Sequence, residues 1–240
     1  MNDTDEKTAL IHTNLEAVQN RIAAAANRSH RDPADITIIA VTKLVSLEMV
    51  RAGYHAGLIY FGENYAEQAV EKIQSLKHAP GIEWHMIGHI QSRKAKMVAE
   101  YFDYVHSVDR MKIARYLDQY SKELNRIMPI LLEVNVSGED SKFGWTAYSE
   151  THWENLVKQF RQIAEMQNLE IRGLMSMPPL SEDPEKTRPV YQKLVRLQQF
   201  LKNALPDVNW KELSIGTSFD FEVAIEEGAT IIRVGRAIFG

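Results

Sequence analysis

DITIIAVTKLVS, residues 35–46, contains a short apolar run that ends beside a lysine. Residues 36–41 are mostly β-branched and leave no polar face, which predicts a β-strand buried on both sides. Strands of this kind are typical of parallel sheets, which helices cover on both faces. Lys43 follows where the strand is expected to end. Because lysine is almost never fully buried, an ammonium at the end of a buried strand needs an explanation.

Seven further segments resemble this strand, and amphipathic segments separate them. The strand candidates are 57–64, 82–89, 102–109, 128–137, 169–179, 210–218 and 230–236. Helical periodicity predicts helices over 5–28, 66–77, 92–101, 110–124, 152–167, 185–205 and 219–228. A strand followed by a helix, repeated along the chain, predicts parallel strands joined by right-handed crossovers.

Eight strand–helix units in 240 residues match the usual size of a (β/α)8 barrel. No linker rich in glycine, serine or proline divides the chain, so we expect one domain over residues 1–240. The predicted fold is a single α/β TIM barrel with an extra N-terminal helix. The alternative, an open doubly wound sheet, usually has a glycine-rich turn after its first strand, and the turn TKLVS has no glycine.

Composition excludes several classes of protein. The formal net charge of −4 argues against a general nucleic-acid or anionic-membrane binder, since both partners need a clustered positive field. The absence of cysteine excludes disulfides and thiolate metal sites. The first residues are acidic and lack the apolar core of a signal peptide, and no later apolar run approaches a membrane span. A cytoplasmic protein is therefore expected.

In such a barrel the chemistry lies at the C-terminal ends of the strands. Two glycine-containing loops fall there: residues 216–218 open a helix, and Gly235 with Arg236 follows the last strand. Backbone N–H groups at a helix start bind anions, and the loops after strands seven and eight of barrels often hold phosphate. We therefore expect a phosphate site. The alternative is that Ser218 caps the following helix and the glycines make turns.

Lys43 is expected at the same end of the barrel. In a partly apolar pocket a lysine tends to lose its charge, because burial penalises the ammonium, and the neutral amine can form an imine with an aldehyde. A phosphate site together with such a lysine indicates pyridoxal 5′-phosphate (PLP). For Lys43 alone, the alternative is pairing with a carboxylate or extension of the ammonium to the rim. A Schiff-base enzyme of the aldolase kind, acting without a cofactor, also stays open.

His85 and His89 share one face of a predicted strand, since side chains alternate along it. No third ligand stands at metal-binding spacing beside them, so a packed or hydrogen-bonded pair is expected rather than zinc. We predict no metal site.

Ordered motifs give a resemblance to a known family. From the first strand to the C-terminus the chain contains AVTK, FGENY, WHMIGHIQSRK, HSVD, EVNVSGEDSKFG, GLMSM and LSIGTSFDFEVAIEEGATIIRVGRAIFG. This series resembles the pyridoxal-phosphate homeostasis proteins (YggS-like or PROSC-like), whose fold is similar to the barrel of alanine racemase. The resemblance implies PLP as the cofactor, held as an internal aldimine on Lys43. The chain departs from the family after that lysine, where LVSLE replaces a Thr or Lys followed by Pro.

The resemblance also implies which other residues bind the cofactor. Some should surround the phosphate, and the rest should contact the ring or form the wall of the pocket. Around the phosphate we expect Ser218, Gly235 and the backbone N–H of Arg236. The ring and wall positions are Asn64, His85, Met175 and, as a ring or phosphate contact, Ser214.

Arg233 matches the arginine that faces the pyridine nitrogen, as in alanine racemase. A permanent cation there disfavours protonation of the ring, which would leave the cofactor a weak electron sink. The alternative is that Arg233 pairs with a nearby carboxylate such as Glu226 or Glu227.

Racemisation by the alanine racemase route needs a tyrosine from a separate C-terminal domain, whereas this chain stops at AIFG. We therefore expect no catalytic residues and a non-catalytic PLP-binding protein. The resemblance implies that it carries or buffers the cofactor and supports vitamin B6 and amino-acid/keto-acid homeostasis. PLP-dependent apo-enzymes are the expected partners, and a monomer is the expected state. The alternative is a PLP-dependent amino-acid racemase, at least a weak one.

Overall fold

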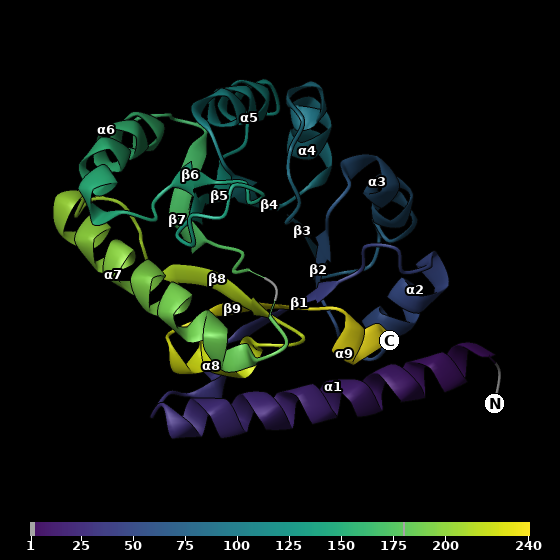
Figure 1. Ribbon diagram of the computed structural model, residues 1–240. Helices are drawn as coiled ribbons and strands as arrows, with labels where there is room; N and C mark the ends of the chain where they lie inside the picture. Colours follow the sequence, from purple (N-terminus) through teal and green to yellow (C-terminus); the bar gives the residue numbers. More distant parts are fainter. Residues whose placement is uncertain (1–2, 180) are drawn as a thin grey trace.

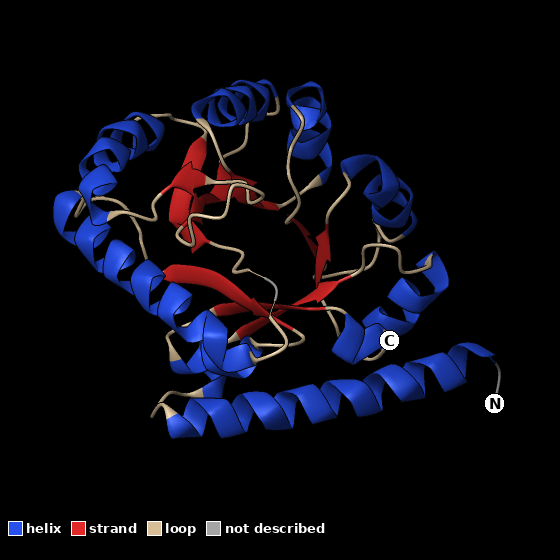
Figure 2. Ribbon diagram, in the orientation of Figure 1, coloured by secondary structure: helices blue, strands red, loops and turns tan. Residues whose placement is uncertain are grey.

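A closed barrel of parallel strands forms the centre of the molecule in the computed structural model, which describes residues 3–179 and 181–240 (Figures 1 and 2). Its strands are β1 (Thr37–Val41), β2 (Tyr60–Glu63), β3 (Glu83–Met86), β4 (Tyr104–Val108), β5 (Met128–Asn135), β7 (Leu169–Met175), β8 (Glu212–Thr217) and β9 (Ile231–Val234). Each pairs with the next in chain order, and β9 pairs with β1 to close the ring. The predicted TIM barrel and its eight strands are confirmed.

Helices surround the barrel and cover the outer faces of its strands (Figure 2). They are α2 (Leu47–His55), α3 (Ala66–Ser75), α4 (Ala95–Tyr101), α5 (Met111–Glu123), α6 (Trp153–Ala164), α7 (Arg188–Ala204), α8 (Phe221–Glu226) and α9 (Arg236–Phe239). The two-residue strand β6 (Trp145–Thr146) pairs with the end of β5. The sequence analysis does not predict α2, α9 or β6.

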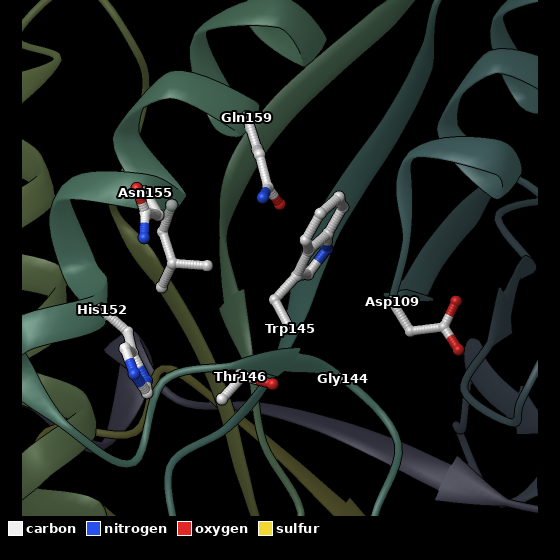
Figure 3. Close-up of a pocket in the computed structure, with 8 residues that line it drawn as sticks. Asp109, Gly144, Trp145, Thr146, His152, Asn155 and Gln159 are labelled. Carbon is white, nitrogen blue, oxygen red and sulfur yellow. The ribbon is translucent and has the colours of Figure 1, made fainter.

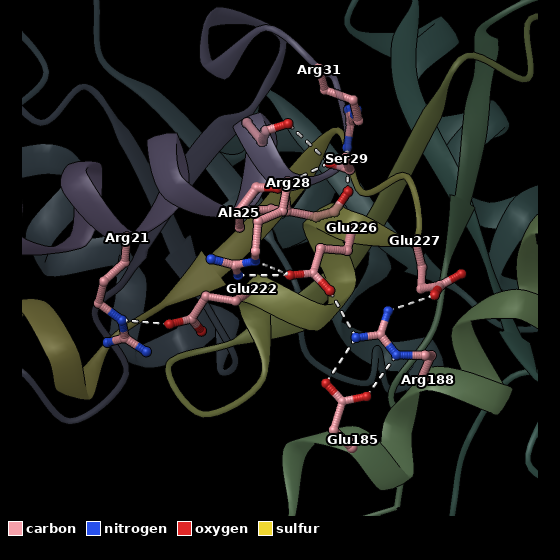
Figure 4. Close-up of polar contacts among 12 residues, drawn as sticks. Arg21, Ala25, Arg28, Ser29, Arg31, Glu185, Arg188, Glu222, Glu226 and Glu227 are labelled. Carbon is pink, nitrogen blue, oxygen red and sulfur yellow. Dashed lines mark hydrogen bonds and ion pairs between the residues drawn. The ribbon is translucent and has the colours of Figure 1, made fainter.

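The predicted N-terminal helix is α1 (Asp3–Arg28), which lies across α2, α8 and α9 (Figure 1). Its apolar stripe is buried and includes Ile11, Val18 and Ile22. Two ion pairs with α8 hold its polar side: Arg21 Nε lies 2.6 Å from a carboxylate oxygen of Glu222, and Arg28 pairs with Glu226 at 2.7 Å (Figure 4). No helix among residues 3–179 and 181–240 has the length and apolar character needed to cross a membrane.

The interior of the barrel is only partly apolar. Side chains from six strands meet in one cluster, so they must point into the barrel: Ile39, Tyr60, Tyr104, Leu131, Met175 and Ile231. Buried polar side chains from the same faces of the strands accompany them, and these are His85, His106, Glu133, Ser214 and Arg233. Barrel interiors are usually filled by branched aliphatic residues, so this polar content needs a functional explanation.

The two interior histidines are 3% and 0% exposed. Burial lowers the pKa of His85 to about 3. The pKa of His106 is lowered well below its ordinary value, mainly by burial and to a smaller extent by His85 and Arg233. Both imidazoles are therefore neutral in the folded protein.

Gly88, two residues after β3, lies against the backbone of Asn64. A Cβ atom at Gly88 would lie 2.2 Å from Asn64 O and 2.6 Å from Asn64 Cα. The Gly88 carbonyl also accepts a hydrogen bond from Ser107 Oγ at 2.6 Å. The ends of β2, β3 and β4 are thus joined through a close approach that requires glycine.

Gly88→Ala is expected to lower the free energy of unfolding by about 3 kcal/mol, because the new methyl group must displace the backbone at Asn64. Gly81→Ala is the matched control: Gly81 has φ +78° and no atom within 4 Å of its would-be Cβ. That variant should lose only the backbone strain, about 1 kcal/mol. Urea unfolding measures both values, and equal losses would contradict the close approach at Gly88.

The depressed pKa of His85 predicts a loss of stability in acid. Below pH 6.5 the unfolded chain takes up a proton on this residue that the folded protein does not accept until about pH 3. Stability present above pH 6.5 is therefore lost as the pH falls, by about 1.4 kcal/mol per pH unit. Unfolding in urea at a series of pH values should give a steeper decline for the wild type than for His85→Gln. Parallel curves would show that His85 titrates normally.

Candidate functional site

The end of β1 and the loops after β8 and β9 meet at one rim of the barrel. β9 pairs in parallel with both β1 and β8, so the three strands end side by side. A Cβ atom at Gly235 would lie 3.0 Å from Val41 O and 3.2 Å from Val41 Cβ, which shows how closely the last loop approaches β1. Lys43 follows Val41 by two residues and thus emerges beside Gly235.

Lys43 is exposed, and its ammonium has no hydrogen-bond or ion-pair partner in the part of the chain that the structure describes. It occupies a turn that Val45 N–H closes by donating to Thr42 O at 3.0 Å. Leu44 in this turn has φ +62°, an uncommon conformation for a residue other than glycine. The alternative that Lys43 pairs with a carboxylate is therefore wrong, and its amine is free to meet a ligand.

A buried ion pair fixes the residue before Lys43. Lys72 Nζ donates to Thr42 O at 2.7 Å and lies 2.8 Å from Glu63 Oε1, which also accepts the hydroxyl of Thr42 at 2.8 Å. Thr42 and Glu63 are fully buried, and Lys72 is nearly so. Because Thr42 N–H donates to Gly62 O as well, every polar group of Thr42 is engaged. The backbone that carries Lys43 is thus held in place.

Ser218 does not cap the helix that follows it. The residue before α8 is Asp220, and its side chain makes no capping hydrogen bond. Ser218 Oγ instead accepts the backbone N–H groups of Gly235 at 3.2 Å and Ala237 at 3.3 Å. The alternative assignment of Ser218 is therefore wrong, and the structure gathers a hydroxyl and two amides beside the end of β1.

Gly216, near the end of β8, is required by the close packing there. Its φ is +89°, and a Cβ atom would lie 2.7 Å from Ala224 Cβ and 2.9 Å from Phe221 Cα. Arg236, the first residue of α9, is exposed, so its side chain is free of the core. The end of β8 can therefore pack closely on α8, while Ser218 bonds the segment after β9.

Arg233 is 4% exposed, and its four Nη hydrogens meet only uncharged acceptors. Nη1 donates to Ser214 O and Ser214 Oγ, both at 2.6 Å; Nη2 donates to Ser176 O at 3.1 Å and to Met177 Sδ at 2.7 Å. Burial lowers its pKa, yet an arginine keeps its proton in proteins. Arg233 is thus a buried cation with no ion pair among the described residues.

The carboxylates considered as partners of Arg233 pair elsewhere. Glu226 lies 2.7 Å from both Arg28 and Arg188, and Glu227 lies 2.7 Å from Arg188 (Figure 4). The alternative that Arg233 pairs with Glu226 or Glu227 is therefore wrong.

Among the buried oxygen atoms near the rim that lack hydrogen-bond partners are Asn64 Oδ1 and Glu133 Oε2. Asn64 follows β2 directly, and Glu133 alternates with the interior residue Leu131 along β5, so it points into the barrel. The pKa of Glu133 is raised to about 7, mainly by burial and to a smaller extent by the charge of Asp109; the charge of Arg233 opposes this rise only in part. Polar atoms without partners in a buried setting are costly, which is typical of a ligand site.

The remaining predicted site residues lie deeper in the barrel. Met175 ends β7 and is 1% exposed, and Ser214 in β8 is fully buried beneath Arg233. His85 Nδ1 lies 3.0 Å from His106 Nε2. The sequence analysis missed His106 and Glu133, although strand alternation from Tyr104 and from Leu131 places both in the interior.

His85 and His89 do not form a pair with each other. His89 Nδ1 lies 2.9 Å from Asp109 Oδ2, and its ring stacks on Phe143 with centroids 3.9 Å apart. Among the described residues, no group of three or more histidine, aspartate or glutamate side chains is arranged to hold a metal ion.

A pocket of about 410 Å³ lies beside this rim, between α6 and the segments after β4 and β5 (Figure 3). Its lining is Asp109, Gly144, Trp145, Thr146, His152, Asn155, Leu156 and Gln159. None of the nine predicted cofactor-binding residues lines it. It is therefore separate from the site around Lys43.

Comparison with known proteins gives a consistent picture. Residues 13–240 match the family model of the alanine racemase N-terminal domain. The pyridoxal phosphate homeostasis protein of Vibrio alginolyticus is 41% identical over 234 residues, which cover 96% of this chain and 97% of that protein.

Solved structures agree with these matches. The PLP-bound structure of PipY from Synechococcus elongatus PCC7942 is 34% identical, covers 93% of this chain and 100% of that chain, and has a TM-score of 0.81. An alanine racemase from Clostridium difficile 630 is 12% identical, with a TM-score of 0.70 over 96% of this chain and 56% of that chain, and shows the barrel fold alone. The chain therefore belongs to the family of pyridoxal phosphate homeostasis proteins, which are built on the N-terminal domain of alanine racemase.

Proposed function

We propose that residues 1–240 act as one domain that binds PLP covalently through Lys43 and carries or buffers it without strong catalysis of its own. Recipients would be PLP-dependent apo-enzymes, and the protein would act as a monomer. The observation that carries the proposal is the meeting of the free Lys43 amine with the Ser218 hydroxyl and the Gly235 and Ala237 amides at one rim. PLP supplies an aldehyde for the first and a phosphate for the second.

The residues around the rim fit this ligand. The Gly235 and Ala237 amides, which donate to the Ser218 hydroxyl, would instead donate to a bound phosphate. Arg236 would contribute its backbone N–H. The buried charge of Arg233 has only neutral acceptors, so a lone pair such as that of a ring nitrogen would be a favourable further neighbour.

Other residues would contact the ring or form the wall of the site. Asn64 has an amide oxygen without a partner, which supports a role in ligand contact. Ser214 holds Arg233 from below, while Met175 and His85 close the floor of the site.

The proposal of weak or absent catalysis rests on Arg233. A cation at the ring nitrogen keeps that nitrogen unprotonated and so limits the stabilisation of a carbanion. One observation favours the alternative, a racemase: the Glu133 carboxyl has a pKa of about 7 and an oxygen without a partner, as a proton-transfer group requires.

Lys43→Ala is expected to abolish the covalent adduct, because Lys43 follows the end of β1, which lies against Gly235. After incubation with PLP and borohydride reduction, mass spectrometry should find a pyridoxyl group on Lys43 of the wild type and none on the variant. Weak binding of PLP should remain, since the anion site comes from other strands. Lys96→Ala, an exposed lysine on α4, is the control and should label normally. A full adduct in Lys43→Ala would place the cofactor on another lysine.

Exchange of the amino-acid α-proton with solvent separates the carrier from the racemase. With PLP-loaded protein and alanine in deuterated water, we expect exchange no faster than with free PLP and amine buffer at the same concentrations. Rapid exchange in the wild type, lost in Glu133→Gln, would instead establish the racemase and identify its proton-transfer group. Nuclear magnetic resonance of the alanine α-proton measures the rate.

A further inference from the structure

A line of four buried side chains crosses the barrel and ends at Arg233. His85 Nδ1 lies 3.0 Å from His106 Nε2, His106 Nδ1 lies 2.9 Å from Ser214 Oγ, and Arg233 Nη1 donates to Ser214 Oγ at 2.6 Å. None of the four is more than 4% exposed. The line therefore connects β3, β4, β8 and β9 through the interior, out of contact with water.

Aromatic rings enclose the two histidines. The Tyr104 ring meets both of them edge to face, with centroids 5.2 Å from His85 and 4.8 Å from His106, and the Tyr60 ring lies 5.8 Å from His85. The hydroxyl of Tyr104 donates to Glu212, so it does not compete for the imidazole nitrogens. Among the described residues, the ring nitrogens of the two histidines have only each other and Ser214 Oγ within hydrogen-bond distance, so no other group competes for their mutual hydrogen bond.

Charges at the two ends set the direction of the hydrogen bonds. Arg233 can only donate, so Ser214 Oγ accepts at that end and is free to give its own proton to His106 Nδ1. His106 then carries its proton on Nε2 and donates it to His85 Nδ1. His85 in turn carries its proton on Nε2, which lies 3.9 Å from Glu83 Oε2.

The reverse direction is unfavourable at both ends. It would leave the Ser214 hydroxyl proton without an acceptor, and it would turn the lone pair of His85 Nε2 toward the Glu83 carboxylate. Cation at one end and anion at the other therefore select one arrangement, in which both imidazoles are neutral with the proton on Nε2.

We propose that His85 and His106 are positioning residues, whose shared Nε2–H tautomer holds the Ser214 hydroxyl in the orientation that keeps Arg233 in place at the cofactor site. The proposal rests on the proposed function only in that the ligand of Arg233 is the PLP ring. Uncharged acceptors hold Arg233 without neutralising it, so its positive charge is able to interact with a ligand. A carboxylate in the same place would hold the guanidinium more strongly and cancel that charge.

The tautomers are measurable without any cofactor. Nitrogen-15 side-chain spectra of the ligand-free protein, labelled on histidine, should show His85 and His106 neutral, with the proton on Nε2 in both. A proton on Nδ1 of either ring, or a charged ring at neutral pH, would overturn the proposal whatever the protein binds.

Three variants test the effect on the cofactor site. His106→Phe removes the acceptor of Ser214 and should weaken PLP binding about tenfold and shift the absorption maximum of the bound cofactor. His106→Asn places an amide oxygen where Nδ1 stood and should restore part of the affinity and the wild-type maximum. His78→Gln, an exposed histidine, is the control and should leave both unchanged.

The outcomes separate this proposal from the proposed function. A wild type that does not bind PLP would refute the function, while the tautomer measurement would still decide the hydrogen-bond direction. A wild type that binds PLP, with a folded His106→Phe of equal affinity and spectrum, would refute the positioning role. If His106→Phe does not fold, the tautomer measurement and a comparison of His106→Asn with the wild type test the positioning role. A ring with its proton on Nδ1 would refute that role.

Discussion

The parallel pairing of β9 with β1 is the interaction on which the site depends. It joins the two ends of the barrel, and it places the turn after β1 beside the loops after β8 and β9. Residues 41 and 235, far apart in the sequence, become neighbours only because the ring closes. The α1 helix supports this closure, since it packs over α8 and α9 and its arginines bond α8 (Figure 4). The contacts that stabilise the closed ring therefore also determine the geometry of the rim.

The barrel interior contains buried polar side chains beside its apolar ones. Aliphatic and aromatic side chains fill one part, while His85, His106, Ser214 and Arg233 fill another, where the Arg233 guanidinium has no ion-pair partner among the described residues. Burying a cation in this way costs free energy, which the surrounding hydrogen bonds offset in part. Such an arrangement is expected where a binding site, rather than stability, determines the residues.

Much of this could be predicted from the sequence, for a physical reason. Buried parallel strands appear in a sequence as short apolar runs, so all eight can be predicted. Because the strands run in the same direction, Lys43, Ser218 and Gly235 are expected at one rim. The nine-residue α2 is not visible in the same way, although Ser46, whose hydroxyl accepts Met49 N–H, marks its start. The partners of Arg233 and the role of His106 depend on which strands face each other across the barrel. That register is a property of the closed ring and not of any local pattern.

The engagement of Thr42 by Lys72 and Glu63 has a consequence for how an aldehyde is captured. The Cα atom of Lys43 is fixed, since its turn is closed and the preceding residue is fully bonded, while the four-carbon stem beyond it is unrestrained. Covalent attachment would therefore order one side chain and no backbone. The entropic penalty is limited to about 2 kcal/mol for the rotamers of a lysine. A carrier built in this way is able to take up and release its cargo with little rearrangement, so exchange is governed by the chemistry of the bond rather than by motion of the chain.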